Sequence, residues 1–458
     1  MANEQIPKTS VTYDAYANRW EFYLRSYLGG EDYQGGNYLT AYKLESSEDY
    51  AERKVQTPLD NQCKNVIHIY SSFLWRALPT REFGVIENDP ALEGYLDDAD
   101  YDGRSHDSVM REATVWSSVY GHCWLILDKP SITSTTRADE LAADIRPYLT
   151  LVTPENVYDW EYERTPTGRH RLVYLKIRES VKGNEKIFRV WTPDFISLWK
   201  VVGDLEPVLI EELPNPIGLI PAVTVYSQRS SLRGVGISDI ADVADIQRAV
   251  YNELSEIEQL IRISNHPSLA KTEGTDASAG AGAIIRMADD LDPGLKPYLL
   301  QPSGGNLDAI RASIEDKIKS VDRVTHLGAV RATEKAAKSG IALQTEFQML
   351  NSKLSEKADL LELAEEQLWK LWAIWQGREW DGVIDYADTF DLRDYATDLE
   401  FLQMARATGV QSATFKTSID KQIAALVVDE DDLAQAYDEI EATPTVLGQF
   451  NTQVEEAA

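Results

Sequence analysis

The chain has 458 residues, 43 % hydrophobic and 26 % charged, the balance of an ordinary soluble globular protein with about two to four structural units. Its formal net charge of −30 argues against a conventional nucleic-acid-binding surface, because such a chain repels polyanions at long range. No apolar run reaches the roughly 18 residues of a membrane-spanning helix, and no signal peptide is expected from "MANEQIPKTS". Cys63 and Cys123 are the only cysteines, which indicates a reducing compartment and no disulfide framework.

The first 121 residues are expected to be mainly helical. Apolar residues recur at helical spacing in "TYDAYANRWEFYLRSYLGG", up to the stop at Gly29 and Gly30, and in "NQCKNVIHIYSSFLWRALP", up to Pro79. A further helix is predicted from "SHDSVMREATVWSSVYG", with Ser105 as its N-cap and Gly121 at its end.

Residues 122–235 change in character and predict strands. Short segments rich in β-branched and aromatic residues alternate here with Pro, Gly and Asn. The predicted strands and hairpins lie in "CWLILDKP", "RPYLTLVTPENVYDW", "HRLVYLKIRES", "KIFRVWTPDFISLWKVV" and "IPAVTVYSQ". The fold class is therefore α+β, predominantly helical.

Two predicted helices, 238–264 and 306–324, enclose a Gly/Pro-rich insertion at 265–305. Ser238 and Asn306 are the expected N-caps. Both helices carry an apolar stripe at alternating spacings of three and four, which favours packing against a nearly parallel or antiparallel helix. The stripe residues expected to pack are Ile240, Val243, Val250, Leu254, Ile257, Ile261, Ile310, Ile314 and Ile318.

The segment 325–340, "THLGAVRATEKAAKSG", is small-residue-rich and basic in an otherwise acidic chain. A helix of about ten turns is predicted after it, to Gly377, with an apolar stripe that includes Leu350, Leu361 and Trp372. Its length means that it either crosses a large body or kinks. The remaining residues, 381–458, predict short helices in which acidic side chains far outnumber basic ones.

Catalytic and metal-binding motifs are not evident. The sequence contains no GxxxxGK[ST] loop, HExxH, GxSxG or paired CxxC motif, so we expect no enzyme. His106, His122 and Cys123 raise a metal hypothesis, but a buried cysteine at a helix-to-strand junction is the favoured interpretation, and no metal or other cofactor is expected.

Two other residue groups have a structural interpretation that we favour. The acidic stretch "DDADYDG", from Asp97 to Gly103, resembles part of a calcium loop but lacks its terminal Glu, which favours a solvated turn. Trp369, Trp372 and Trp375 lie at helical spacing and are expected to be core or interface anchors rather than ligand-stacking residues.

The order of these elements resembles that of the portal proteins of tailed bacteriophages, whose subunits form a ring around the DNA channel at one capsid vertex. The resemblance extends from about residue 10 to 440 and depends on order and spacing, since each motif is loose. The segments "TPENVYDWEYE" and "GHCWLILDKP" are similar to strands of the family's wing. The residues that match the start of its first stem helix and of its long, kinked wing helix are Gly236, Ser238, Asp239, Ile240, Gln247, Asn252, Ser255, Ser339, Gly340, Ala342 and Leu343.

The resemblance implies a portal-type fold with a wing, a stem, a clip and a crown, assembled as a ring of about twelve subunits. The implied regions are 1–237 as the wing, 238–264 and 306–324 as the stem helices, 265–305 as the clip, 325–340 as the tunnel loop, 341–380 as the long wing helix, and 381–458 as the acidic helical crown and tail. The implied partners are other copies of the chain, double-stranded DNA, the large terminase subunit, the major capsid and scaffolding proteins, and adaptor, neck or tail proteins. The implied location is the virion, after synthesis in the host cytoplasm, with no membrane partner.

The same resemblance gives roles to the basic residues. Arg331, Lys335 and Lys338 would contact DNA phosphates from the tunnel loop, weakly and without reading sequence. The alternative is an exposed linker with incidental lysines. Four stem residues lie off the apolar stripe, where they could line the channel or pair with Glu256 and Glu258 of a neighbouring helix; they are Arg311, Lys317, Lys319 and Arg323. Arg286 and Lys296 would belong to the clip.

The net charge allows two interpretations, solubility alone or an acidic channel wall along which DNA slides. Two further functions stay open at this point. The chain could be another phage structural component, such as a tail adaptor or minor head protein, or a hydrolase with a dispersed pair of carboxylates.

Overall fold

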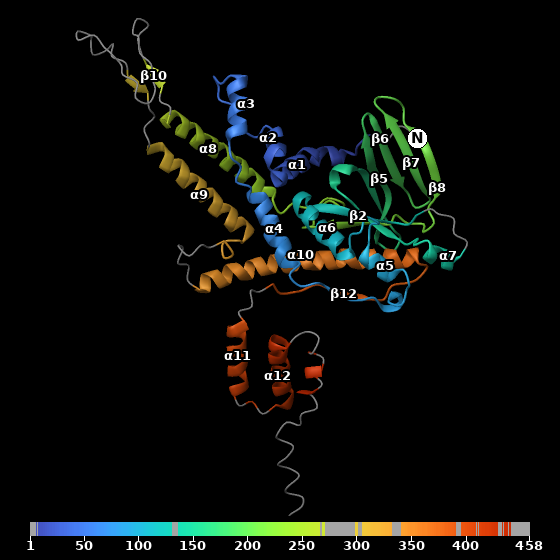
Figure 1. Cartoon of the computed structure of the whole chain (residues 1–458). Coiled ribbons are helices and arrows are strands. Elements are labelled where there is room, and N and C mark those ends of the chain that lie inside the picture. Colours follow the sequence, from blue (N-terminus) through green and yellow to red (C-terminus); the bar gives the residue numbers. More distant parts are fainter. Residues whose placement is uncertain are drawn as a thin grey trace, which may run out of the picture. The chain divides into compact units, whose positions relative to one another are not determined.

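The computed structural model describes residues 6, 8–130, 136–265, 268–270, 298–300, 305–331, 340–390, 395–408, 410, 412–428, 433, 435–437 and 439–440. The chain forms two compact units, Met1–Phe390 and Asp391–Ala458. The first unit mixes helices with antiparallel sheets, which confirms the α+β class (Figure 1). Among the described residues, every helix is too short or too polar to span a bilayer.

The N-terminal part of the first unit is helical, as predicted. Ser105 caps its helix by accepting a hydrogen bond from the Ser108 amide (3.3 Å), and Gly121 ends that helix with a φ of 92°. Both boundary predictions are confirmed. The elements are α1 (Val11–Leu28), α2 (Gly30–Gly35), α3 (Ser47–Gln56), α4 (Gln62–Leu74), β1 (Thr80–Glu82), η2 (Gly84–Ile86), α5 (Leu92–Asp97) and α6 (His106–Tyr120).

The following strands form two antiparallel sheets. The three-stranded sheet has the order β3-β2-β9, with bounds Tyr148–Val152, His122–Asp128 and Ala222–Tyr226. The five-stranded sheet is a meander in chain order, with β4 (Val157–Arg164), β5 (His170–Lys182), β6 (Glu185–Trp191), β7 (Phe195–Val202) and β8 (Val208–Pro214). Each predicted segment contains a strand. The sequence did not predict β8, an edge strand whose residues are almost all exposed and therefore lack the alternation of a half-buried strand.

Two short elements connect these strands. The helix α7 (Arg137–Ala142) precedes β3, and η3 (Pro154–Asn156) leads into β4. The main hydrophobic core lies between α4, α6, β2, β9 and the long helix that follows later in the chain.

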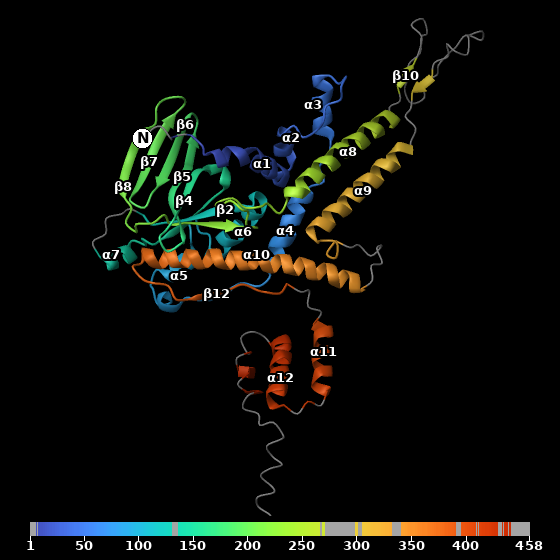
Figure 2. The same ribbon diagram turned by 180° about the vertical axis from the view of Figure 1, so that it is seen from behind.

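A helical hairpin follows β9. Its helices are α8 (Ala241–Asn265) and α9 (Gly305–Thr325), and between them the short strands β10 (Ser268–Ala270) and β11 (Tyr298–Leu300) pair antiparallel. Figures 1 and 2 show the hairpin extending away from the sheets of the first unit. Both helices were predicted, but α8 begins three residues after Ser238 and α9 begins at Gly305, so Asn306 lies inside it.

The long helix α10 (Gly340–Trp375) is continuous over 36 residues and lies along one side of the first unit (Figure 2). Its predicted stripe is buried at Leu350, Leu354, Leu361, Leu368 and Trp372. No break in α10 corresponds to the kink that the resemblance implies, since one continuous face of the helix packs against the core.

The boundary after α10 differs from the sequence-based one at 380. Strand β12 (Val383–Asp385) pairs with β1, and Tyr386 and Phe390 are buried in the main core. Residues 381–390 therefore belong to the first unit, because their apolar side chains complete its core. The second unit contains α11 (Tyr395–Ala407) and α12 (Ala413–Val427), joined by an Arg406–Asp420 ion pair of 3.2 Å.

Candidate functional site: a helical hairpin anchored to a long helix

The two helices of the hairpin pack through the predicted apolar stripe. Val250, Ile257 and Ile314 are buried between α8 and α9. The partly buried residues around them are Ile246, Leu254, Ile261, Ile310 and Ile318. The seam is thus a helix–helix contact of the kind that the three–four spacing predicts. Ile240 and Val243 are different, because they are buried in the main core and not in the seam.

The basic residues of α9 divide into one that is paired across the hairpin and three that point to solvent. The Lys317 ammonium lies 2.6 Å from Glu253 of α8 and also donates to Ser313 (2.7 Å). Arg311, Lys319 and Arg323 are exposed. Within one chain Lys317 therefore pairs with Glu253, and the Glu256 carboxylate accepts from the Tyr42 hydroxyl (2.8 Å). Pairing of the stem residues with Glu256 and Glu258 between subunits stays a prediction.

The base of α8 is built into the body of the first unit. The buried side chain of Gln247 accepts a hydrogen bond from the Cys63 amide (2.9 Å) and donates one to the Ser26 carbonyl (3.1 Å). Farther along the helix, buried Arg53 donates to Ser255 (2.9 Å) and pairs with Glu45 (2.6 Å). These contacts fix the first half of α8 to the N-terminal helices, so the hairpin projects from a rigid base.

A buried ion pair joins the start of α8 to α10. Lys357 on α10 lies 2.6 Å from Asp239, and its ammonium also contacts the hydroxyls of Ser227 (2.5 Å) and Ser118 (3.1 Å). Burial by itself would raise the pKa of Asp239, but the charges of Lys357 and Lys353 hold that pKa below its ordinary value. Burial lowers the pKa of Lys357, and Asp239 opposes this effect.

Ser238 explains why α8 starts late. Its hydroxyl donates to the carbonyls of Val119 (2.6 Å) and Ser118 (3.1 Å) at the end of α6 and accepts from the Ile240 amide (3.2 Å). The side chain thus ties the chain to α6 before the helix begins. Together with Asp239 it forms the joint between the hairpin and the body.

A second buried carboxylate lies in the C-terminal half of α10. Glu365 accepts from Arg81 (2.6 Å), Tyr386 (2.5 Å) and Trp369 (3.1 Å), and it lies 3.0 Å from a ring nitrogen of His106. Burial opposes ionisation of Glu365, but hydrogen bonds and charge from His106 and Arg81 outweigh it and lower its pKa well below the ordinary range.

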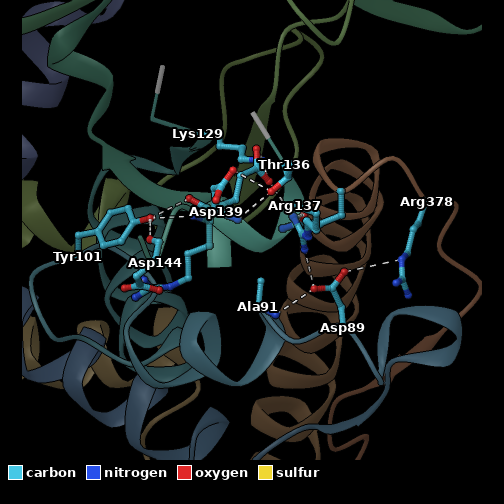
Figure 3. A network of polar contacts seen from close by, with 12 residues as sticks. Asp89, Ala91, Tyr101, Lys129, Thr136, Arg137, Asp139, Asp144 and Arg378 are labelled. Carbon is cyan, nitrogen blue, oxygen red and sulfur yellow. Dashed lines mark hydrogen bonds and ion pairs between the residues drawn. The ribbon is translucent and has the colours of Figure 1, made fainter. Parts of the chain in front are cut away.

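A third polar network fixes the C-terminal end of α10 to α7 (Figure 3). The buried Asp89 carboxylate lies between two guanidinium groups, 2.9 Å from Arg137 and 3.7 Å from Arg378. It also accepts from the Ala91 amide (2.9 Å), and Thr136 caps α7 by accepting from the Asp139 amide. The long helix is therefore held by polar contacts at its middle (Lys357), in its C-terminal half (Glu365) and just beyond its C-terminal end (Arg378).

Arg331 forms several contacts within the chain, and its predicted contact with DNA stays a prediction. Its guanidinium pairs with Asp322 (2.9 Å) and donates to Gln62 (2.8 Å) and Asn65 (2.6 Å), and only 16 % of the side chain is exposed. Arg331 thus fastens the end of α9 to α4. Lys335, Lys338, Arg286 and Lys296 lie outside the described residues.

The residues considered as possible metal or calcium ligands form hydrogen bonds and ion pairs within the chain. His122 accepts from the Gly236 amide (3.2 Å), Cys123 donates to the Ala113 carbonyl (3.3 Å), and His106 contacts Glu365. In the described part of the chain, no group of three or more His, Cys, Asp or Glu side chains forms a candidate metal site. Within "DDADYDG", Asp100 accepts from the Asp102 amide and pairs with Arg104, which gives an internally bonded turn.

Sequence reasoning missed the buried partners of the site. Asp239 was noted as part of a motif, but Lys357 lies 118 residues away and sits between apolar positions of a long amphipathic helix. A lysine on the buried side of a predicted apolar stripe is the signal that could have identified it, since such a residue needs a partner.

No protein-family model and no curated protein matches the chain. The chain is similar to a solved chain from the neck of an empty gene transfer agent (GTA) particle, computed with C6 symmetry, at 10 % identity and a TM-score of 0.45, with 83 % of this chain and 94 % of that chain covered. A chain from the virion of a native GTA particle gives 10 % identity and a TM-score of 0.44, with 78 % and 89 % covered. Because both TM-scores are low, the proposals below depend on the residues of this chain.

Proposed function

We propose that this chain is a structural subunit of a tailed-phage-like particle and, more specifically, a portal subunit that forms a ring around a DNA channel. The observation that carries the proposal is the α8–α9 hairpin. Its two helices bury one apolar seam, extend from a rigid base and leave Arg311, Lys319 and Arg323 exposed. A projecting hairpin with a polar outer face is suited to line up with copies of itself around a bore.

The charge distribution supports a channel whose wall does not bind DNA tightly. With a net charge of −30 in each subunit, the wall of a ring repels phosphate at most points and lets the duplex slide. In this proposal Lys335 and Lys338 supply weak, salt-dependent phosphate contacts at one level of the channel, while Arg331 fastens the end of α9 to α4. The partners proposed are DNA, the large terminase subunit, capsid and scaffolding proteins, and neck or tail proteins.

The contacts of two buried carboxylates argue against a hydrolase. Asp239 and Glu365 are both saturated by partners within the chain, including Lys357 and Arg81. A general acid or base must be reachable by a substrate, and these two side chains are buried, with 4 % of Asp239 and 0 % of Glu365 exposed. We therefore propose no catalytic role, in agreement with the missing motifs.

Native mass spectrometry and negative-stain imaging of the purified chain test the proposal. We expect closed rings of about twelve subunits with a central hole, and association with the large terminase subunit. Rings that bind neck proteins but not the terminase would favour a tail adaptor or minor head protein instead. A strictly monomeric chain at all concentrations and salt levels would contradict the portal proposal.

A further inference from the structure

A cleft of about 620 Å³ lies where the β4–β5 end of the five-stranded sheet meets the loop 227–236, which leads from β9 to the base of α8. Tyr162 of β4, Tyr226 of β9 and Gln367 of α10 contribute to its lining. A cavity of this volume can hold a small ligand or a short peptide segment. It is far too small for a DNA duplex.

The loop 227–236 is held in one conformation by its own hydrogen bonds. The Ser230 hydroxyl accepts from the Leu232 amide (3.1 Å) and donates to the Val235 carbonyl (2.7 Å). The Arg233 carbonyl accepts from the Trp160 indole (3.0 Å). Gly234, with a φ of 75°, is so close to the Trp160 ring that a Cβ at this position would clash. The loop therefore presents Arg229 and Arg233 in fixed backbone positions.

The charges in the cleft are of one sign. Arg171, Arg229 and Arg233 line it, and none of the described lining residues is an aspartate or glutamate. In the described part of the chain, neither Arg229 nor Arg233 forms an ion pair. Glu163 faces Arg171 in the strand register, but the Arg171 guanidinium donates instead to the Gly218 carbonyl.

The two loop arginines act on the same region of the cleft. Arg229 lies over the Tyr226 ring, with its guanidinium carbon 5.5 Å from the ring centre. Burial raises the pKa of Tyr162 to about 12, and the positive charges of Arg233 and Arg229 oppose that shift. Planar guanidinium groups without an internal ion pair are the usual means of binding an oxyanion through two parallel hydrogen bonds.

We propose that this basic cleft binds carboxylate side chains of an adjacent copy of the same chain. The inference rests on the proposed function, because it requires neighbouring copies. Subunits of net charge −30 repel each other, so a ring needs complementary contacts, and a basic cleft without carboxylates provides one. Its loop leads to the start of α8 at Ala241, at the base of the hairpin that the ring would place beside a neighbour.

A charge-reversal experiment tests the inference. Assembly of the R229E/R233E variant is compared by native mass spectrometry with that of the wild type and of K182E/K186E, a control with the same charge change at exposed positions of β5 and β6. We expect assembly of R229E/R233E to weaken by about tenfold or more, while the control forms rings as the wild type does. Equal assembly of all three proteins would overturn the inference and leave the proposed function intact, whereas a monomeric wild type would overturn both.

A cross-linking experiment identifies the occupant and does not depend on disrupting the ring. In R229K/R233K, which keeps the charge, a carbodiimide joins each new lysine amine to any carboxylate in contact. With mixed light- and heavy-isotope subunits, we expect links from position 229 or 233 to an Asp or Glu of the other isotope. Links only within one subunit, or none in assembled rings, would contradict the inference. Loss of DNA binding by R229E/R233E in rings that still form would assign the cleft to phosphate instead.

Discussion

At the scale of single residues, the structure depends on a few buried polar contacts along α10. Asp239–Lys357 and Glu365–Arg81 are ion pairs whose members are almost fully excluded from water. Removing one member of such a pair leaves the other charge buried and uncompensated, which costs about 3–5 kcal/mol. Replacing both members is much less destabilising, because no charge is left in the core.

The first prediction concerns Lys357. K357M should lower the free energy of unfolding by about 3 kcal/mol or more, because Asp239 keeps only Lys353 at 3.7 Å as a nearby cation. The double variant D239N/K357M should be less destabilised than the sum of the two single variants. Denaturant unfolding of all four proteins in a double-mutant cycle measures the coupling, and additive effects would contradict the prediction.

The second prediction concerns pH. The pKa of Glu365 is lower in the folded chain than in the unfolded one, so its contribution to stability is present above the ordinary value of about 4.3 and is lost as pH falls toward the folded pKa. The E365Q variant should therefore be less stable than the wild type at pH 7, by about 3 kcal/mol. This difference should shrink below about pH 4, as followed by denaturant unfolding at several pH values. A stability difference between E365Q and the wild type that does not change with pH would show that ionisation of Glu365 does not contribute to stability.

The third prediction concerns Gly121, which has a φ of 92°. A Cβ added at this position would lie 2.6 Å from backbone atoms of Gly236. G121A should lower stability by about 2 kcal/mol or more, because both the backbone conformation and the close approach become unfavourable. G103A is the matched control, since Gly103 has a φ of 84° but no atom within 4 Å of an added Cβ. If thermal unfolding changes equally in both variants, the contact with Gly236 is not important.

At the scale of elements, the hairpin combines a fixed base with an outer part held by one seam. Gln247, Ser255 and Asp239 connect α8 to the body, whereas most of α9 contacts only α8. The outer half of the hairpin should therefore open at a lower free energy than the core.

The fourth prediction uses this difference. Ile314 is 9 % exposed in the seam, and I314D should bury an unpaired charge at a cost of several kcal/mol. We expect faster amide hydrogen exchange in α9 while α4, α6 and α10 keep their protection. V324D is the control, since Val324 is 44 % exposed, and it should leave exchange nearly unchanged. Equal exchange in the two variants would mean that the seam does not hold α9.

At the scale of the whole molecule, the basic residues of the segment 325–340 have two different roles in the proposal. Arg331 supports the fold, whereas Lys335 and Lys338 contact DNA. Arg331 is tied to α4 and α9, so R331A should destabilise the fold by about 1–3 kcal/mol through its lost hydrogen bonds. In the proposed portal, reversal of Lys335 and Lys338 should act on DNA instead.

The fifth prediction therefore separates assembly from DNA passage. The K335E/K338E variant should form rings and unfold as the wild type does, but DNA packaging or retention in particles should be impaired. Packaging is measured as the fraction of DNA-filled particles. Normal packaging by the variant would remove the case for phosphate contacts by this segment.

The sequence by itself determined the elements whose residues repeat with a regular period. The seam of α8 and α9, the buried face of α10 and most strands follow from such patterns, because each residue's face depends only on its neighbours along the chain. The exposed edge strand β8 has no such pattern and was missed.

Only the tertiary structure decided which polar groups meet. Lys357 finds Asp239 across 118 residues and His106 finds Glu365 across 259, and neither separation carries a local signal. The same holds for Arg331, whose ion pair with Asp322 fastens α9, and for residues 383–385, which pair with β1. Ion pairs and core contacts depend on distance in space, which the chain fixes only after its periodic elements have packed.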